Sequence, residues 1–130
     1  MIEAALVALL EQDAAVAAIV GDRIYPSIIP QRVASPALAY WRVSTVRQQL
    51  FDHPAADAAV RYQIDAQADS YPVARELAGA LRRVLNGYRG TLDGEHIHHI
   101  VLAGEQDIYD TETGAHRVAL DIIVTHDEEQ

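Results

Sequence analysis

Histidines cluster in the second half of the chain, with residue types and spacing that could bind a metal. His96 and His98 are two positions apart, so on a β-strand their side chains would share one face and could hold a single ion. His116 or Asp121 from the following strand could supply a third ligand. The alternative is a polar strand surface whose imidazoles face water. Because the spacing fixes no third ligand, we assign neither a metal nor a cofactor, and a metal-dependent hydrolase using His96 and His98 remains only an alternative function.

Three acidic residues, Asp107, Asp110 and Glu112, lie between two apolar segments near the end of the chain. Paired carboxylates could perform acid–base chemistry, but the sequence marks no buried partner for them. Their spacing also differs from that of a calcium loop, in which acidic ligands alternate before a glycine. We therefore expect residues 105–114 to form a solvated hairpin loop that turns near Gly114.

Nucleophilic and phosphate-binding motifs are absent from the sequence. There is no Cys, which excludes a thiol nucleophile and thiolate metal ligands. No serine lies in a Gly-x-Ser-x-Gly context, the serines being Ser27, Ser35, Ser44 and Ser70. The glycines between 87 and 94 are scattered, as in a flexible connection. We predict no catalytic residue and a protein that is not an enzyme.

The charge and length of the chain restrict its partners. Its 130 residues fit one domain, expected to span residues 1–130. The net charge is −9, and all ten basic residues are arginines, which makes the chain a poor candidate for wrapping nucleic acid. The apolar segment 1–20 is interrupted by acidic residues and lacks a basic start, which predicts neither a signal peptide nor a membrane span. We expect a protein of the cytoplasm or of a virion.

Hydrophobic periodicity predicts the elements that must position these residues. Apolar residues repeat at helical spacing over 2–11, 14–20 and 71–86. Asp13 is the expected N-cap of the second helix and Gly21 its end. Strand-forming segments are 37–46, 59–68, 97–103 and 115–126, and the prolines of 21–36 predict an extended connection. The order α-α-β-β-α-β-β predicts an α+β domain with a twisted, mainly antiparallel or mixed sheet and helices packed on one face.

The segment 59–68 has the clearest alternation of apolar and polar residues. One set is apolar, Val60, Tyr62, Ile64, Ala66 and Ala68, and the other is polar, Arg61, Gln63, Asp65 and Gln67. Such a strand has one buried face and one that meets water or a partner. Ser70 and Pro72 follow, and they predict the start of the next helix with Ser70 as its capping residue.

A hexapeptide, Gly21-Asp-Arg-Ile-Tyr-Pro26, follows the second predicted helix. Pro36-Ala-Leu-Ala-Tyr40, the alternating strand, the helix after it and an acidic hairpin with Tyr109-Asp110 come later in the chain. In this order, these features resemble the tail-completion family of long-tailed bacteriophages, prophages and gene transfer agents. The resemblance covers nearly the whole chain, but residues 45–58 and 87–98 match no part of the pattern.

The resemblance implies a structural virion protein that forms a ring, commonly hexameric, on the head-proximal end of the tail tube. Such a ring ends tube polymerisation and helps to join tail to head. Its expected partners are sister subunits, the tail tube protein and a head-completion or stopper protein, with DNA passing through an acidic lumen without specific binding. A head–tail adaptor or stopper of the same connector is the alternative. The expected location is the virion tail, after assembly in the host cytoplasm.

A closed ring requires two different surfaces on each subunit, because each patch meets a different patch of its neighbour. Two segments are candidates for these surfaces. The first has an apolar tip flanked by polar groups and consists of Arg47, Gln48, Gln49, Leu50 and Phe51. The second is the acidic hairpin with Asp107, Asp110 and Glu112. We predict that both contact a sister subunit or the tube protein.

Overall fold

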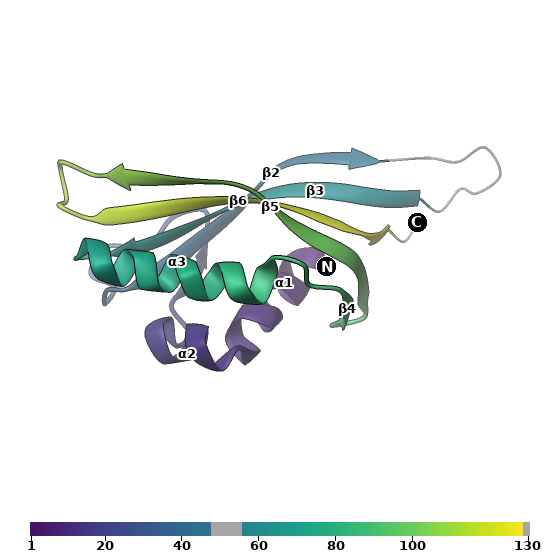
Figure 1. The fold of residues 1–130 in the computed structure, drawn as a ribbon, viewed down its shortest axis with the longest axis horizontal. Coiled ribbons are helices and arrows are strands. Elements are labelled where there is room, and N and C mark those ends of the chain that lie inside the picture. Colours follow the sequence, from purple (N-terminus) through teal and green to yellow (C-terminus); the bar gives the residue numbers. More distant parts are fainter. Residues whose placement is uncertain (48–55, 129–130) are drawn as a thin grey trace.

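The computed structural model describes residues 1–47 and 56–128, which form helices on one face of a six-stranded sheet (Figure 1). The helices are α1 (Ile2–Gln12), α2 (Ala14–Val20) and α3 (Tyr71–Leu85). The strands are β1 (Ile24–Pro26), β2 (Ala37–Arg47), β3 (Ala56–Ala68), β4 (Gly90–Leu92), β5 (Glu95–Tyr109) and β6 (His116–Glu128). The predicted α+β class with helices on one face is confirmed. Among the described helices, none has the length and apolar character needed to cross a membrane.

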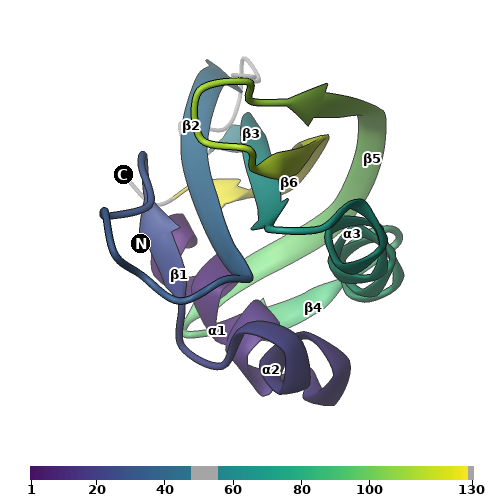
Figure 2. The same ribbon diagram turned by 90° about the vertical axis from the view of Figure 1, so that its left-hand side faces the viewer.

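The sheet is mixed and has the order β1-β2-β3-β6-β5-β4. β1 runs parallel to β2, and all other neighbours are antiparallel. The long strands twist and curl over the helices, as the end-on view shows (Figure 2). Both edge strands have only three residues, which limits the exposed edge available for unwanted pairing. Neither edge strand was predicted, because a three-residue segment is too short to show alternation.

The hexapeptide Gly21–Pro26 joins the helical layer to the sheet. Gly21 ends α2 with a φ of 58°, in the region that favours glycine. Arg23 Nε donates a hydrogen bond to the Pro36 carbonyl over 2.8 Å, and the Arg23 carbonyl accepts one from the Leu38 N–H over 2.9 Å. These bonds align β1 beside β2. The motif that carries the family resemblance therefore has a structural role in this chain.

The core lies between the sheet and the helices. The apolar set of β3 is buried as predicted, and α3 packs against it with Leu77, Leu81 and Leu85. From β6, the buried residues are Val118, Leu120, Ile122 and Val124. Asp13 caps α2, since its carboxylate accepts the Val16 N–H over 3.0 Å. The periodicity of the sequence thus identified the inner face of the sheet correctly.

A polar cluster ties α1 to β2 and β3 at the margin of this core. The Glu3 carboxylate accepts hydrogen bonds from the Tyr62 hydroxyl and from Arg42 Nε, each over 2.8 Å. Tyr62 is fully buried, and desolvation together with the Glu3 carboxylate raises its pKa. Its hydroxyl therefore stays protonated and acts as a donor to Glu3 across the physiological pH range.

Two local expectations are wrong. Ser70 occupies the N-cap position of α3, but its side chain makes no capping hydrogen bond. Pro72 in the first turn lacks an N–H, so it leaves fewer donors there that need a cap. The segment 105–114 is not a loop throughout, because β5 continues to Tyr109. Cross-strand pairing with β6, including Ile108 opposite Arg117, extends the strand into the acidic sequence.

Candidate assembly surface

The face of the sheet opposite the helices is built from the odd-numbered residues of β3 and β6. The antiparallel register places Gln63 opposite Asp121 and Arg61 opposite Ile123. On the diagonal, Arg61 Nη1 donates a hydrogen bond to the Asp121 carboxylate and forms an ion pair with it. This uncovered face therefore presents paired charges at its centre. Charge pairs of this kind fix orientation in a protein interface more than they add affinity.

An open hollow of about 440 Å³ lies on this face. Apolar and charged groups line it together: Val43, Arg61, Gln63, Gly104, Glu105, Gln106, Ile108, Ala119, Leu120 and Asp121. Val43 is 51% exposed, and Val101 on β5 is 45% exposed. Such a mixed, open surface is more typical of a protein contact than of an enclosed small-molecule site.

Asp65 departs from the predicted polar face because it is only 3% exposed. Its Oδ1 accepts a hydrogen bond from Gln63 Nε2 over 3.1 Å, and its Oδ2 lies 3.3 Å from Arg117 Nη1. A second hollow beside this pair is lined in part by residues 27–29, which follow β1. The chain after β1 therefore borders one end of the uncovered face. This face was predicted to meet water or a partner, but Asp65 is shielded from water by groups of its own chain.

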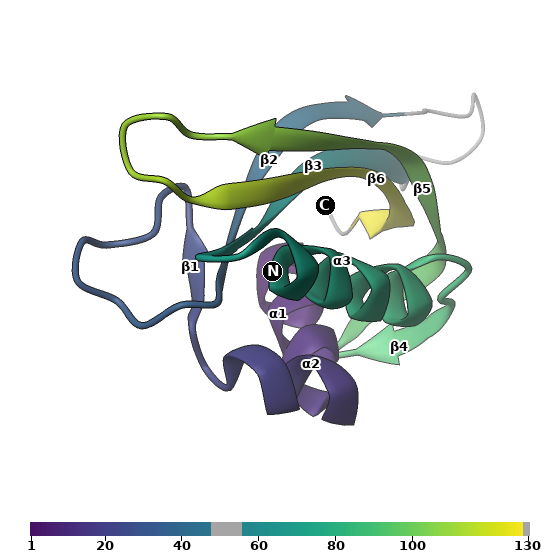
Figure 3. The ribbon, with the colours of Figure 1, turned by 60° about the vertical axis from the view of Figure 1, so that its left-hand side comes forward.

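The β5–β6 hairpin extends beyond the first turn of α3 (Figure 3). Asp107, predicted to lie in a loop, lies instead on β5 beside this turn. Its carboxylate accepts a hydrogen bond from the Tyr71 hydroxyl over 2.6 Å and one from Arg75 Nη1 over 3.1 Å. The hydrogen bond from Tyr71 is the largest cause that lowers the pKa of Asp107. Desolvation opposes it, and the charge and hydrogen bond of Arg75 lower the pKa further. Asp107 therefore anchors the hairpin to the helix.

The turn of the hairpin is closed by Asp110. Its Oδ1 accepts the backbone N–H of Glu112 over 2.9 Å and that of Thr113 over 3.4 Å. The first of these bonds is the main cause that lowers the pKa of Asp110. The side chain of Glu112 is exposed, and Tyr109 is 55% exposed. Asp110 thus shapes the turn, whereas Tyr109 and Glu112 form its outward surface.

Of the other predicted interface segment, only Arg47 is among the described residues, and it lies at the opposite end of the sheet. Arg47 is the last residue of β2, and the predicted contacts Gln48, Gln49, Leu50 and Phe51 lie outside the described residues. Arg47 pairs with Ala58, and the hairpin begins where Ala68 pairs with His116. Ten residues of β3 separate these positions, or about 33 Å at the rise of a strand. Arg47 therefore lies far from the hairpin.

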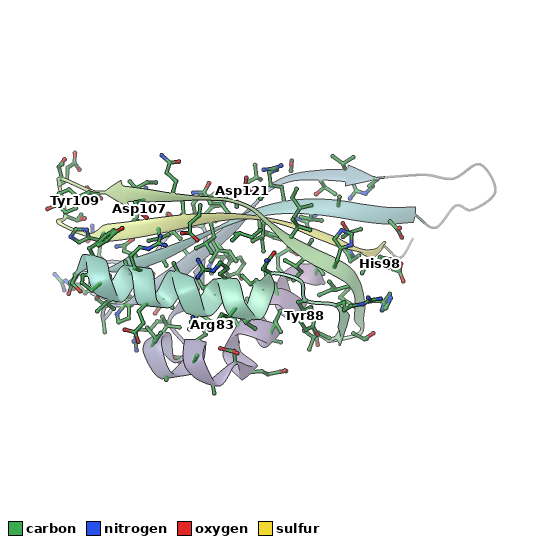
Figure 4. All side chains as sticks on the ribbon, viewed as in Figure 1. Arg83, Tyr88, His98, Asp107, Tyr109 and Asp121 are labelled. Carbon is green, nitrogen blue, oxygen red and sulfur yellow. The ribbon has the colours of Figure 1, made fainter. Side chains whose placement is uncertain are left out.

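The histidine cluster also lies at the end of the sheet away from the hairpin. Figure 4 shows His98 at this end, Asp107 and Tyr109 at the other, and Asp121 between them. The rings of His96 and His98 meet edge-on, with centroids 4.9 Å apart. His98 Nε2 lies 2.7 Å from Asp127 Oδ1 and 3.3 Å from Asp57 Oδ1. The hydrogen bond from His98 lowers the pKa of Asp127.

The structure corrects the predicted third partner of this cluster. His96 and His98 come together with Asp127, and not with His116 or Asp121. His116 packs against the rings of two tyrosines at the hairpin end, and Asp121 pairs with an arginine in mid-sheet. The alternation of 118–124, continued to residue 127, places Asp127 on the uncovered face. The register of β6 against β5 was needed to show that Asp127 lies beside His98.

A curled sheet with one uncovered, charge-patterned face and a projecting hairpin defines the class of a small α+β assembly protein. The chain belongs to the family of tail completion protein gp17, which it matches over residues 4–127. It is thus a structural protein of the virion tail and not an enzyme, and both predictions are confirmed.

The same fold occurs in a solved structure. A chain from a structure described as the virion of a native gene transfer agent particle superimposes with a TM-score of 0.78 at 20% identity. The alignment covers 97% of this chain and 94% of the other. Among curated proteins, no relative matches the sequence.

Proposed function

We propose that this protein caps the head-proximal end of a long tail tube, stops its polymerisation and helps to join the tail to the head. The observation that carries this proposal is the family match, which extends over residues 4–127. The shared fold with a chain of a gene transfer agent virion supports a role within an assembled particle of that kind.

The cap is a ring of sister subunits, a hexamer, that contact each other through two different surfaces. The hairpin is one candidate surface, because its base is fixed by the bonds of Asp107 to Tyr71 and Arg75. A surface that is already ordered loses little conformational entropy on binding. Tyr109 and Glu112 are the exposed side chains that such a projection offers to a neighbour or to the tube. The uncovered face of the sheet is the candidate second surface.

The negative net charge of the chain is compatible with a ring through which DNA passes. The chain has a net charge of −9, so a lumen lined by its acidic residues repels the phosphate backbone and avoids specific binding. DNA then slides through without being held.

The test uses the purified chain together with the tail tube protein of the same particle. We expect electron microscopy to show rings at one end of the tubes, and tube growth to stop when the chain is added. Absence of binding to tubes would contradict capping. Binding to a head-side connector protein alone would favour the alternative of an adaptor or stopper.

A matched pair of charge reversals tests the hairpin separately. Glu112→Arg changes the exposed turn, and Glu76→Arg changes an exposed position on α3 that is not part of the turn. We expect Glu112→Arg to lower the fraction of capped tubes and Glu76→Arg to leave it unchanged. If both variants cap tubes as the unmodified chain does, the hairpin is not a contact surface, although the capping function stands.

A further inference from the structure

Four potential metal ligands lie together where β3, β5 and β6 meet at the end of the sheet away from the hairpin. They are Asp57 on β3, His96 and His98 on β5, and Asp127 on β6, and we call them the His–Asp cluster. The ligand atoms of His96, His98 and Asp127 all lie within 4.8 Å of one another. Asp57 joins them through its 3.3 Å contact with His98 Nε2.

The geometry points to a zinc site formed by these four side chains, with the ion joining three strands of one chain. Zinc takes imidazole nitrogen and carboxylate oxygen in tetrahedral sites with bonds of about 2.0–2.2 Å, so neighbouring ligand atoms lie roughly 3.3 Å apart. The contacts of His98 Nε2 with Asp127 and Asp57, at 2.7 Å and 3.3 Å, are close to this spacing. Two imidazoles favour zinc over magnesium or calcium, which prefer oxygen ligands alone.

The backbone of β5 turns both histidines toward the site. The pairing of β5 with β6 shifts register between Ile97 and His99, which is a β-bulge at His98. Ile97 and Ile100 are both buried, although they are three residues apart and a regular strand would point them to opposite faces. The bulge therefore keeps the apolar pair in the core and leaves the imidazole of His98 beside Asp127.

A hydrogen bond outside the four ligands orients His96. Its Nδ1 lies 3.2 Å from the Thr91 hydroxyl on β4. When Nδ1 carries the proton and donates it to this hydroxyl, the lone pair is on Nε2. Histidine ligands of metals commonly donate their other ring N–H in this manner, which fixes the tautomer. The Thr91 contact thus prepares Nε2 of His96 to bind the ion.

The charges of the cluster also favour a cation. Asp57 and Asp127 stand directly opposite each other in the β3–β6 ladder, and like charges at such positions destabilise a sheet. Their side chains are 51% and 56% exposed, so an ion can enter from solvent. Arg89 is one positive charge near the site, since it lines a hollow with His96 and His98. With four protein ligands the site is closed, which is the arrangement of structural and not catalytic zinc.

Calorimetric titration of zinc chloride into the full chain tests this inference. The protein carries no polyhistidine tag, because a tag binds zinc itself, and it is stripped with chelator before use. We expect one zinc per chain, a rise in the melting temperature when zinc is added, and no comparable effect of magnesium chloride. X-ray absorption should show nitrogen and oxygen ligands at about 2.0–2.1 Å. Failure of zinc to bind, or binding without a rise in melting temperature, overturns the site.

Substitutions on β5 assign the ligands. His98→Gln and His96→Gln should each weaken zinc binding at least about tenfold and abolish the zinc-dependent rise in melting temperature. His99→Gln is the matched control, because His99 is exposed on the same strand but lies outside the cluster. Circular dichroism without zinc checks that each variant folds. Equal losses in His98→Gln and His99→Gln would overturn the assignment, and neither outcome depends on whether the chain caps tubes.

Discussion

Removal of one buried hydroxyl should measure how strongly α1 is held to the sheet. Tyr62→Phe keeps the packed ring and deletes only the group that donates to Glu3 over 2.8 Å. Hydrogen bonds to charged partners contribute about 1.5–3 kcal/mol. Because the melting temperature of a chain this size falls by about 4 °C per kcal/mol lost, we expect a decrease of about 6–12 °C at pH 7 in a calorimetric scan. A decrease below about 2 °C would mean that the bond contributes less than about 0.5 kcal/mol, which would contradict this expectation.

The pH dependence of a second variant separates the charge of Glu3 from its packing. Burial, the largest single influence, raises the pKa of Glu3, but the bonds from Tyr62, the backbone and Arg42 together outweigh it and lower the pKa below 4.5. A carboxyl with a lowered folded pKa stabilises the protein above its unfolded pKa, and this contribution is lost as pH falls through the folded value. The difference in unfolding free energy between the unmodified chain and Glu3→Gln should therefore be largest at pH 7 and should disappear in acid. A difference that is constant with pH would contradict this.

Two further predictions concern the hairpin and the motif turn. Tyr71→Phe should raise the pKa of Asp107 toward its ordinary value, because it removes the first cause of the lowered pKa; carboxyl carbon NMR would detect this, and an unchanged titration would refute it. Gly21→Ala should lower the free energy of unfolding by about 1–3 kcal/mol because of the φ of 58°. The control, Gly79→Ala within α3, should be neutral or stabilising, and equal losses in both variants would refute the argument from φ.

The elements that sequence reasoning identified are those with local causes. The cap at Asp13, the stop at Gly21 and the alternation of 59–68 each depend on a few neighbouring residues, and the structure reproduces them. The edge strands and the extension of β5 to Tyr109 depend instead on pairing with another strand, such as Gly90 with Ile97 and Tyr109 with His116. Local periodicity carries no information on such pairing.

The residues of the candidate site also differ in whether the sequence reveals them. His96 and His98 were found from their spacing, whereas Asp57 and Asp127 come from strands whose order the sequence does not reveal. The bulge at His98 could not be predicted from the sequence. Its only trace there is the three-residue spacing of Ile97 and Ile100, which are both buried. The anchoring role of Asp107 required the position of α3 beside β5. In each case the missing information was the register between distant segments.

The hexapeptide motif and the proposed zinc site have different roles in the structure. The hexapeptide Gly21–Pro26 holds an edge strand in place, so it identifies the fold and says little about which surfaces make contacts. Three members of the His–Asp cluster, in contrast, lie in 45–58 and 87–98, the segments outside the motifs that carry the sequence resemblance. The proposed zinc site is therefore independent of those motifs. Because the ion would join β3, β5 and β6 at the end of the sheet away from the β5–β6 hairpin, it would stabilise the part of the sheet where opposed carboxylates otherwise weaken the pairing.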